Sequence, residues 1–217
     1  VPRWSPDGRM LAARRMRPGN WNSQLALIEI GSGGTRLIVA ETGVVASYAW
    51  SPDGGRVLYT GDVTQTWQLD FFLLEVASGE VRQLTRDLHC LPDAGMATIA
   101  PPAHPVWLDD HHALFHAFEH GASGLYIIDT GSGEVQTVQR MEALNQGLSA
   151  DREARVFAQA HSSFARAGEI SVFTRETGQA RVVTDYSGPV LAEARPADVE
   201  RFEVRRGEFT IEALSLI

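Results

Sequence analysis

Two short motifs recur in step along the chain, and this repetition is the strongest constraint on its fold. The first motif, Trp4-Ser5-Pro6-Asp7-Gly8, returns 46 residues later as Trp50-Ser51-Pro52-Asp53-Gly54, and weaker copies stand at 107–111 and 148–152. The second motif is an apolar run followed by a Ser-Gly or Thr-Gly turn. Its glycines are spaced 46, 54 and 45 residues apart: Gly33, Gly79, Gly133 and Gly178. Such self-similarity indicates a repeat architecture.

Each copy has the chemistry of short strands joined by tight turns. Proline presets φ in Ser-Pro-Asp-Gly, and glycine suits the last turn position. In the second copy we expect strands at 45–50, 56–60, 71–76 and 80–84. Four antiparallel strands repeating every ~40–50 residues are typical of a β-propeller blade. The sequence therefore predicts an all-β, partial β-propeller of about four four-stranded blades, with repeats near 1–42, 43–88, 106–140 and 143–186.

Other architectures fit the repeats less well. A helical solenoid needs an apolar period of ~3.6 residues, which the copies lack, and the best helical candidate, 141–148, is short. A sandwich would not repeat one turn sequence in step. Four copies could close a small ring or form an arc of a larger one. We favour the arc, because the first copy starts at its turn motif.

Composition excludes several classes of partner. The 217 residues carry 19 basic and 27 acidic side chains, a formal charge of −8, without a basic block. We therefore expect neither a nucleic-acid nor a membrane partner. No apolar run approaches the ~20 residues that span a bilayer. The single cysteine, Cys90, cannot form an internal disulfide. We expect a cytoplasmic protein.

No motif in the chain predicts catalysis, a cofactor or a metal site. The nucleophile elbow Gly-x-Ser-x-Gly is absent, and its nearest match, 147–151, fails at the last position. Gly31-Ser32-Gly33-Gly34 is a hairpin turn, because the phosphate-loop spacing is missing. Four histidines cluster at 111–120, where helical spacing would allow a metal site. The repeat makes 112–118 a strand instead, which spreads His112 and His116 apart. We therefore expect a structural role for them.

The connections between strands hold the remaining candidates. The irregular stretch 86–105 joins one blade to the next. It either faces a partner domain or the substrate, since long loops often carry function, or it is an insertion tolerated on the surface. Cys90 within it should be buried and inert. Trp21 and Trp67 stand in loops between second and third strands, where an indole either binds a peptide or folds over the blade edge. The repeat tryptophans should belong to the blade core: Trp4, Trp50 and Trp107.

The Trp-Ser-Pro-Asp-Gly copies resemble the propeller repeats of the TolB family and of prolyl oligopeptidase-family serine peptidases. The stretch 157–173 and the following 181–193 are similar to the final blade of acylaminoacyl-peptidase-type members. The segment 196–217, beginning Pro-Ala-Asp-Val-Glu-Arg-Phe, resembles that family's crossover from propeller to α/β-hydrolase domain. The resemblance divides the chain into blades at 1–195 and a crossover at 196–217, and the family's hydrolase domain is missing.

The resemblance implies a function for the whole protein. In such a peptidase the propeller gates access of short peptides to the hydrolase active site and excludes folded chains. The partners implied are the missing hydrolase domain and short peptide substrates, and this chain alone would not hydrolyse them. Open blade edges also suggest self-association. A TolB-like module that binds protein or small solutes, and a non-functional remnant, stay open as alternatives.

Overall fold

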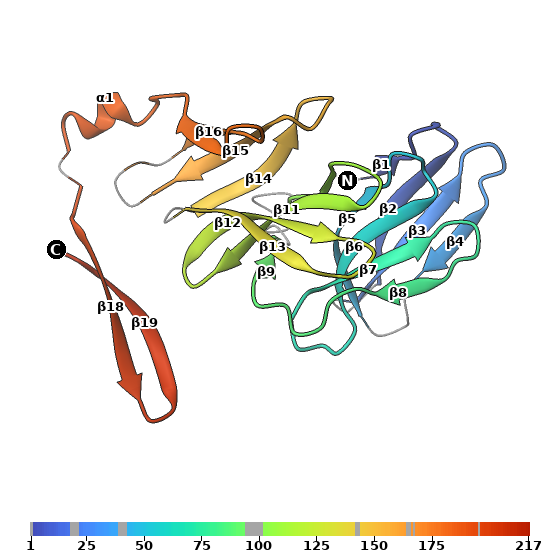
Figure 1. The fold of residues 1–217 in the computed structure, drawn as a ribbon, viewed down its shortest axis with the longest axis horizontal. Coiled ribbons are helices and arrows are strands. Elements are labelled where there is room, and N and C mark those ends of the chain that lie inside the picture. Colours follow the sequence, from blue (N-terminus) through green and yellow to red (C-terminus); the bar gives the residue numbers. More distant parts are fainter. Residues whose placement is uncertain are drawn as a thin grey trace.

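The computed structural model describes residues 2–17, 22–38, 43–93, 102–141, 144–163, 166, 168–194 and 196–217. Within them the strands form four successive antiparallel sheets and a separate hairpin (Figure 1). The first sheet contains β1 (Arg3–Trp4), β2 (Met10–Met16), β3 (Ser23–Glu29) and β4 (Thr35–Ile38). The second contains β5 (Val44–Trp50), β6 (Arg56–Asp62), β7 (Asp70–Glu75) and β8 (Val81–Gln83).

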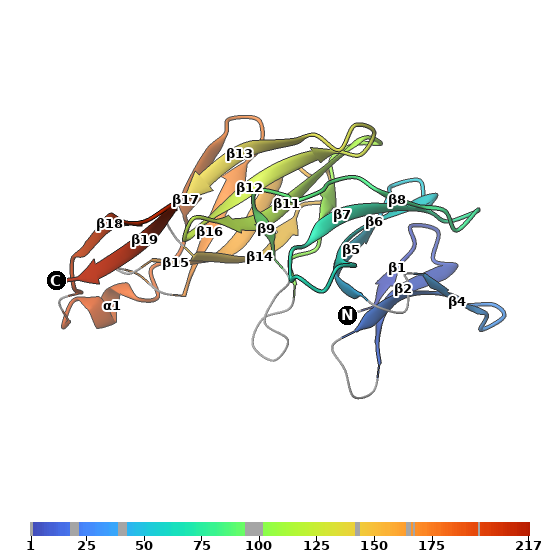
Figure 2. The ribbon, with the colours of Figure 1, turned by 90° about the horizontal axis from the view of Figure 1, so that it is seen from below.

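The third and fourth sheets repeat this order. The third contains β10 (Val106–Trp107), β11 (His112–Glu119), β12 (Ala122–Asp129) and β13 (Val135–Met141), and a short extra strand, β9 (Leu91–Pro92), pairs with the other end of β11. The fourth contains β14 (Leu144–Ala150), β15 (Val156–Ser162), β16 (Glu169–Thr174) and β17 (Gln179–Val182). The sheets follow one another along an arc, with the first and fourth at its ends (Figures 1 and 2). The all-β prediction of about four four-stranded blades is confirmed.

The repeated turns explain why the sheets are alike. In the first two copies the serine hydroxyl contacts the aspartate, at 2.6 Å for Ser5 and 2.5 Å for Ser51, and also accepts a backbone N–H five residues later. The four glycines of the second motif all adopt positive φ, from 65° to 81°. Because L side chains avoid this region, glycine is the residue that closes each turn without strain.

The fourth copy is displaced from the position that the sequence indicates. The turn runs from Asp151 to Val156, with Asp151 in the place of Ser51, because Asp151 N donates to Val156 O as Ser51 N donates to Arg56 O. Ala154 takes the place of Gly54 and keeps its positive φ, at 51° against 72°. The copy at 148–152 was therefore placed too early, since the residues that mark this turn have been replaced.

Three apolar clusters lie between neighbouring sheets and hold the arc together. Each combines buried side chains of two adjacent sheets, such as Leu27 with Tyr59, Leu58 with Phe115, and Leu114 with Phe157. Burial of apolar surface between sheets is the main source of stability in such a stack. Each sheet therefore depends on its neighbours rather than on a core of its own.

The repeat tryptophans link the sheets, with one exception. Trp50 is 8% exposed and its Nε1 donates to Arg3 O at 3.0 Å, and Trp107 is 9% exposed and donates to Ala49 O at 3.4 Å. Each indole thus reaches the backbone of the preceding sheet. Trp4 is 59% exposed, so its assignment to the core was wrong. It lies on the first sheet, and none of the apolar clusters formed by the described residues covers the corresponding face of that sheet.

One helix occurs among the described residues, α1 (Gly188–Leu191), and with four residues it is far too short to cross a membrane. The helical candidate at 141–148 was wrong, because Met141 ends β13 and β14 begins at Leu144. Strand pairing with β12 and β15 overrides the local preference of these residues. The chain ends in a two-stranded hairpin, β18 (Val199–Arg206) and β19 (Phe209–Leu216), that extends away from the fourth sheet (Figure 1).

Candidate functional site

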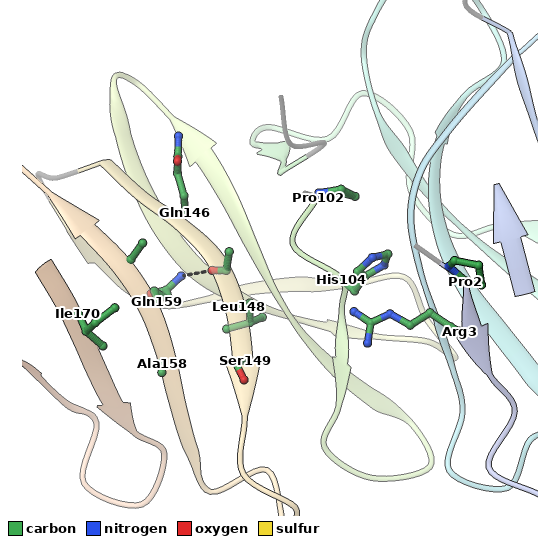
Figure 3. A pocket seen from close by; sticks show the side chains of 12 residues that line it. Pro2, Arg3, Pro102, His104, Gln146, Leu148, Ser149, Ala158, Gln159 and Ile170 are labelled. Atoms are coloured by element: carbon green, nitrogen blue, oxygen red, sulfur yellow. Dashed lines mark hydrogen bonds between the residues drawn. The ribbon is translucent and has the colours of Figure 1, made fainter. Parts of the chain in front are cut away.

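The first strands of all four sheets border one hollow on the inner side of the arc. Two adjoining cavities of ≈ 540 and ≈ 520 Å³ make it up, and they share Arg3, His104, Leu148 and Ser149 in their walls. We call this space the axial hollow. Its size is that of a small-molecule site. The larger cavity is shown in Figure 3.

The segment before β10 brings His104 into the wall. His104 is buried, and its Nδ1 lies 2.9 Å from Tyr48 O and 3.2 Å from Tyr48 N on β5. Its Nε2 is buried and has no hydrogen-bond partner among the described residues. Burial, with the nearby positive charge of Arg3 as the next cause, lowers the pKa of His104 to about 4. The imidazole is therefore neutral at neutral pH.

Arg3 supplies the positive charge of the hollow. Its backbone on β1 is held by the Trp50 indole, which donates to Arg3 O, while its guanidinium lies beside the His104 ring (Figure 3). No hydrogen bond or ion pair joins this guanidinium to another described residue. Asp151 also borders the hollow, but backbone N–H groups of Arg155 and Val156 hold its carboxylate at 2.6 and 3.0 Å and lower its pKa.

The opposite wall comes from the fourth sheet. A register shift between Gln146 and Ser149 interrupts the pairing of β14 with β15, and Gly147 there has φ of 68°. Ser149, the serine of the nearest nucleophile-elbow match, lines the hollow, but no hydrogen bond joins it to a described histidine. The arrangement offers the Arg3 cation, the Asp151 carboxylate and neutral polar groups, but no serine hydrogen-bonded to a described histidine as a nucleophile would need.

The clustered histidines lie apart on or beside a strand. β11 spans His112–Glu119, so the prediction of a strand here is confirmed. His112 Nδ1 lies 2.9 Å from Asp109 Oδ1, whereas the buried His116 Nδ1 lies 3.1 Å from Asp93 Oδ2. His120 belongs to the turn after β11, with φ of 46°. In the described ranges no three His, Cys, Asp or Glu side chains are grouped as metal ligands would be.

Cys90 is buried in the cluster between the second and third sheets, as predicted. Burial, with the charge of Glu119 as a smaller cause, raises the pKa of its thiol to about 12. The thiolate is the reactive form of cysteine. Cys90 is therefore a packing residue at neutral pH.

The long connection reaches the hollow at its C-terminal end. Pro102, His104 and Pro105 border the hollow, whereas 94–101 lie outside the described residues. Trp21 also lies outside them. Trp67 is 62% exposed, on a loop that Asp62 organises by accepting backbone N–H bonds from Thr64, Gln65 and Trp67. More than half of the Trp67 surface is thus open to solvent.

Sequence reasoning missed Arg3, His104 and Ser149 as neighbours. The repeat offers a signal for Arg3, and for Ser149 only once the structure has corrected the position of the fourth copy. The residue before the repeat tryptophan, or before the residue in its place, borders the hollow in all four copies: Arg3, Ala49, Val106 and Ser149. His104 carries no such signal, because its place depends on the path of an irregular connection.

Comparison with known proteins identifies the fold. No family model and no curated protein matches the chain. Among solved structures, a puromycin hydrolase mutant complexed with PGG is 22% identical with a TM-score of 0.72, covering 98% of this chain and 32% of that one. Puromycin hydrolase itself is 21% identical with a TM-score of 0.70, and it also covers 98% of this chain and 32% of that one. TolB from Acinetobacter baumannii is 15% identical with a TM-score of 0.65, covering 100% of this chain and 51% of that one.

The chain thus spans about a third of the puromycin hydrolase chain and about half of TolB. The similarity extends over nearly the whole of this chain, and the sequence identity is low. The chain therefore has the fold of a TolB-like β-propeller, as an arc of four four-stranded blades followed by a hairpin.

Proposed function

We propose that the chain is the non-catalytic propeller part of a prolyl oligopeptidase-family serine peptidase, and that it gates access of short peptides to an α/β-hydrolase domain. The observation that carries the proposal is an exposed apolar face on the terminal hairpin. The likeness to puromycin hydrolase, which includes this hairpin within 98% coverage, supports it. A cytoplasmic location, which the single cysteine favours, belongs to the same proposal.

The two faces of the hairpin differ in chemistry. The pairings Phe202↔Ala213, Val204↔Ile211 and Arg206↔Phe209 put four exposed apolar side chains on one face: Phe202, Val204, Phe209 and Ile211. The other face is mixed: Val199, Leu214 and Leu216 are exposed there, and Arg201 forms an ion pair with Glu212 and donates to His120 O, which ties the hairpin to the third sheet.

The exposed apolar face indicates a missing neighbour. A two-stranded hairpin is at best marginally stable in water without packing, and an exposed apolar patch of this kind marks an interaction site. The hairpin begins at residue 199, inside the crossover that the resemblance assigns to 196–217. A hydrolase domain packed on Phe202 and Ile211 would cover this face. The blades would then stand over its active site and exclude folded chains by their size.

The test uses the full-length product of the gene that encodes this chain. We expect hydrolysis of acyl-amino acid and prolyl reporter peptides that a serine-directed inhibitor abolishes, with folded proteins left intact. Ile211→Glu should lower both the hydrolysis rate and the unfolding midpoint, because it puts a charge into the interface. Thr210→Glu, on the opposite face of the same strand, is the matched control. A product without inhibitor-sensitive hydrolysis contradicts the proposal.

A TolB-like binding module is the second candidate. It is favoured by the likeness to TolB, which covers 100% of this chain. A full-length gene product that carries a secretion signal and no hydrolase domain would favour this candidate over the first.

A further inference from the structure

The same three register positions in each sheet point toward the next sheet of the arc. They hold Ala12, Leu25 and Leu27 in the first sheet, Leu58, Phe71 and Leu73 in the second, and Leu114, Leu125 and Ile127 in the third. All of these side chains belong to the apolar clusters that join one sheet to its successor. In the fourth sheet the same positions hold Ala158, Ile170 and Val172. We call this side of each sheet its forward face.

The opposite side of each sheet, its back face, repeats as well. Three back-face positions hold Trp50, Val57 and Leu74 in the second sheet, Trp107, Ala113 and Ile128 in the third, and Ala150, Phe157 and Phe173 in the fourth. These side chains pack on the forward face of the preceding sheet. In the first sheet the same positions hold Trp4, Leu11 and Ile28.

The arc therefore ends in two faces that match each other. On the back face of the first sheet Trp4 is 59% exposed, and on the forward face of the fourth sheet Ile170 is 36% exposed. These sheets stand at opposite ends of the arc (Figure 1), and none of the clusters formed by the described residues combines the two. Exposed apolar surface of this kind marks an interaction site. The inner interfaces show that a sheet of the same repeat is what fits it.

A repeated indole bond adds a polar contact to these interfaces. Trp50 Nε1 donates to the carbonyl of Arg3, and Trp107 Nε1 donates to the carbonyl of Ala49. In both cases the acceptor is the residue before the tryptophan position in the preceding sheet. Ser149 holds that register position in the fourth sheet. A tryptophan that followed the fourth sheet would therefore donate to the Ser149 carbonyl.

The two ends of the chain hold the halves of one more such bond. The indole N–H of Trp4 has no acceptor in the described part of the chain, and no described side chain donates to the Ser149 carbonyl. We propose that two copies of the chain associate head to tail, with the back face of the first sheet on the forward face of the partner's fourth sheet and the Trp4 indole donating to the partner's Ser149 carbonyl.

This interface joins unlike surfaces, so two copies can form it twice and close a ring. The ring would hold eight sheets, which lies within the ~4–8 blades usual for propellers. The terminal hairpin takes no part in the interface. The inference therefore goes beyond the proposed function and does not depend on it.

Light scattering and sedimentation at increasing protein concentration measure the association. We expect the mass to rise from that of one copy to that of two between about 5 and about 500 μM, the range of a weak reversible interface, and then to stay constant because the ring is closed. The interface should be weaker than the one between the second and third sheets, because Ala158 and Val172 bury less apolar area than Leu58 and Leu73. At the low concentrations of unfolding measurements the chain is a single copy with Trp4 exposed.

Charged variants identify the two faces. Trp4→Glu changes the first sheet and Ile170→Glu the fourth, and each variant alone should abolish the rise in mass, because every interface would then bury an unpaired charge. A mixture of the two variants should regain the mass of two copies, although at higher concentration than the unaltered chain, because each keeps one intact face and only one interface forms. Val81→Glu, at an apolar side chain of similar exposure on the second sheet, is the matched control and should leave the association unchanged.

Three results overturn the proposal: the mass of one copy at every concentration, a mass that grows past two copies, or a mixture of Trp4→Glu and Ile170→Glu that stays at one copy. Circular dichroism and unfolding midpoints establish that each variant is folded. If Ile170→Glu does not fold, Ala160→Glu tests the same face of the fourth sheet, since Ala160 is exposed and pairs with Ile170.

The full-length gene product supplies the last measurement. A product that stays a single copy, and whose unfolding midpoint is lowered by Trp4→Glu, would mean that another part of that product covers the face, and this result also overturns the proposal. Hydrolysis by the same product is measured separately. Failure of the association and failure of the proposed function are therefore distinguishable.

Discussion

Replacing each repeat tryptophan by phenylalanine tests the sheet-on-sheet assembly directly. In Trp50→Phe the smaller ring loses on the order of 50 Å² of buried apolar surface, or about 1.3 kcal/mol. The Arg3 carbonyl also loses the indole N–H, which donates at 3.0 Å, at a further cost of about 1 kcal/mol. We expect Trp50→Phe to lower the free energy of unfolding by about 2 kcal/mol.

Trp107→Phe should cost less than Trp50→Phe, because its indole bond to Ala49 O is longer, at 3.4 Å. Trp4→Phe should change the free energy of unfolding by less than about 0.5 kcal/mol, since Trp4 is 59% exposed and its indole N–H has no acceptor among the described residues. Urea denaturation followed by circular dichroism measures all three variants. A cost for Trp4→Phe equal to that for Trp50→Phe would refute the reasoning, because it would place Trp4 in a packed interface.

Three further perturbations follow from single positions. Gly133→Ala should destabilise the chain more than Gly33→Ala. Both glycines have positive φ, but only at Gly133 would an added Cβ overlap the Leu84 carbonyl oxygen. Chemical denaturation of the two variants measures the difference in the free energy of unfolding. Native Cys90 should react with a thiol reagent at pH 8 only after denaturant is added, because burial raises its pKa to about 12; rapid reaction of the native chain would contradict this. The pKa of His104 is about 4 in the folded chain and near 6.5 in the unfolded chain. The free energy of unfolding should therefore be highest above pH 6.5 and should fall by at most about 3 kcal/mol as the pH drops to 4. His104→Gln should flatten that part of the pH–stability curve, and an identical curve for the variant would rule His104 out as its source.

The strand pattern was predictable because the same turn motifs and apolar runs recur in several copies. The strands expected in the second copy agree with β5 to β8 to within two residues at each end. Turn residues carry this information locally: the four motif glycines all have positive φ, which few other residues adopt without strain. Where the local signal has been lost, as at Ala154, the sequence placed the turn wrongly.

The candidate site was largely hidden from sequence reasoning. Arg3 and His104 are about a hundred residues apart, and they meet because the first and third sheets both turn their innermost segments to the inside of the arc. His104 further depends on the Tyr48 backbone, which lies on another sheet. Contacts between residues so far apart do not repeat along the chain. The repeat pattern of a single sequence therefore could not reveal them.

The sequence by itself determined the blade: its turns, its strand order, and the alternation that gives each sheet two apolar faces. These follow from backbone preferences and from the side-chain period of two, which act within a few residues. The tertiary structure decided which of those faces are covered. Trp4 and Trp50 stand in the same motif, yet one is exposed and the other buried, because burial depends on whether another sheet packs against the indole. The hollow also depends on tertiary structure. Four strand positions that lie far apart in the sequence border one space because the four sheets follow an arc: Arg3, Ala49, Val106 and Ser149.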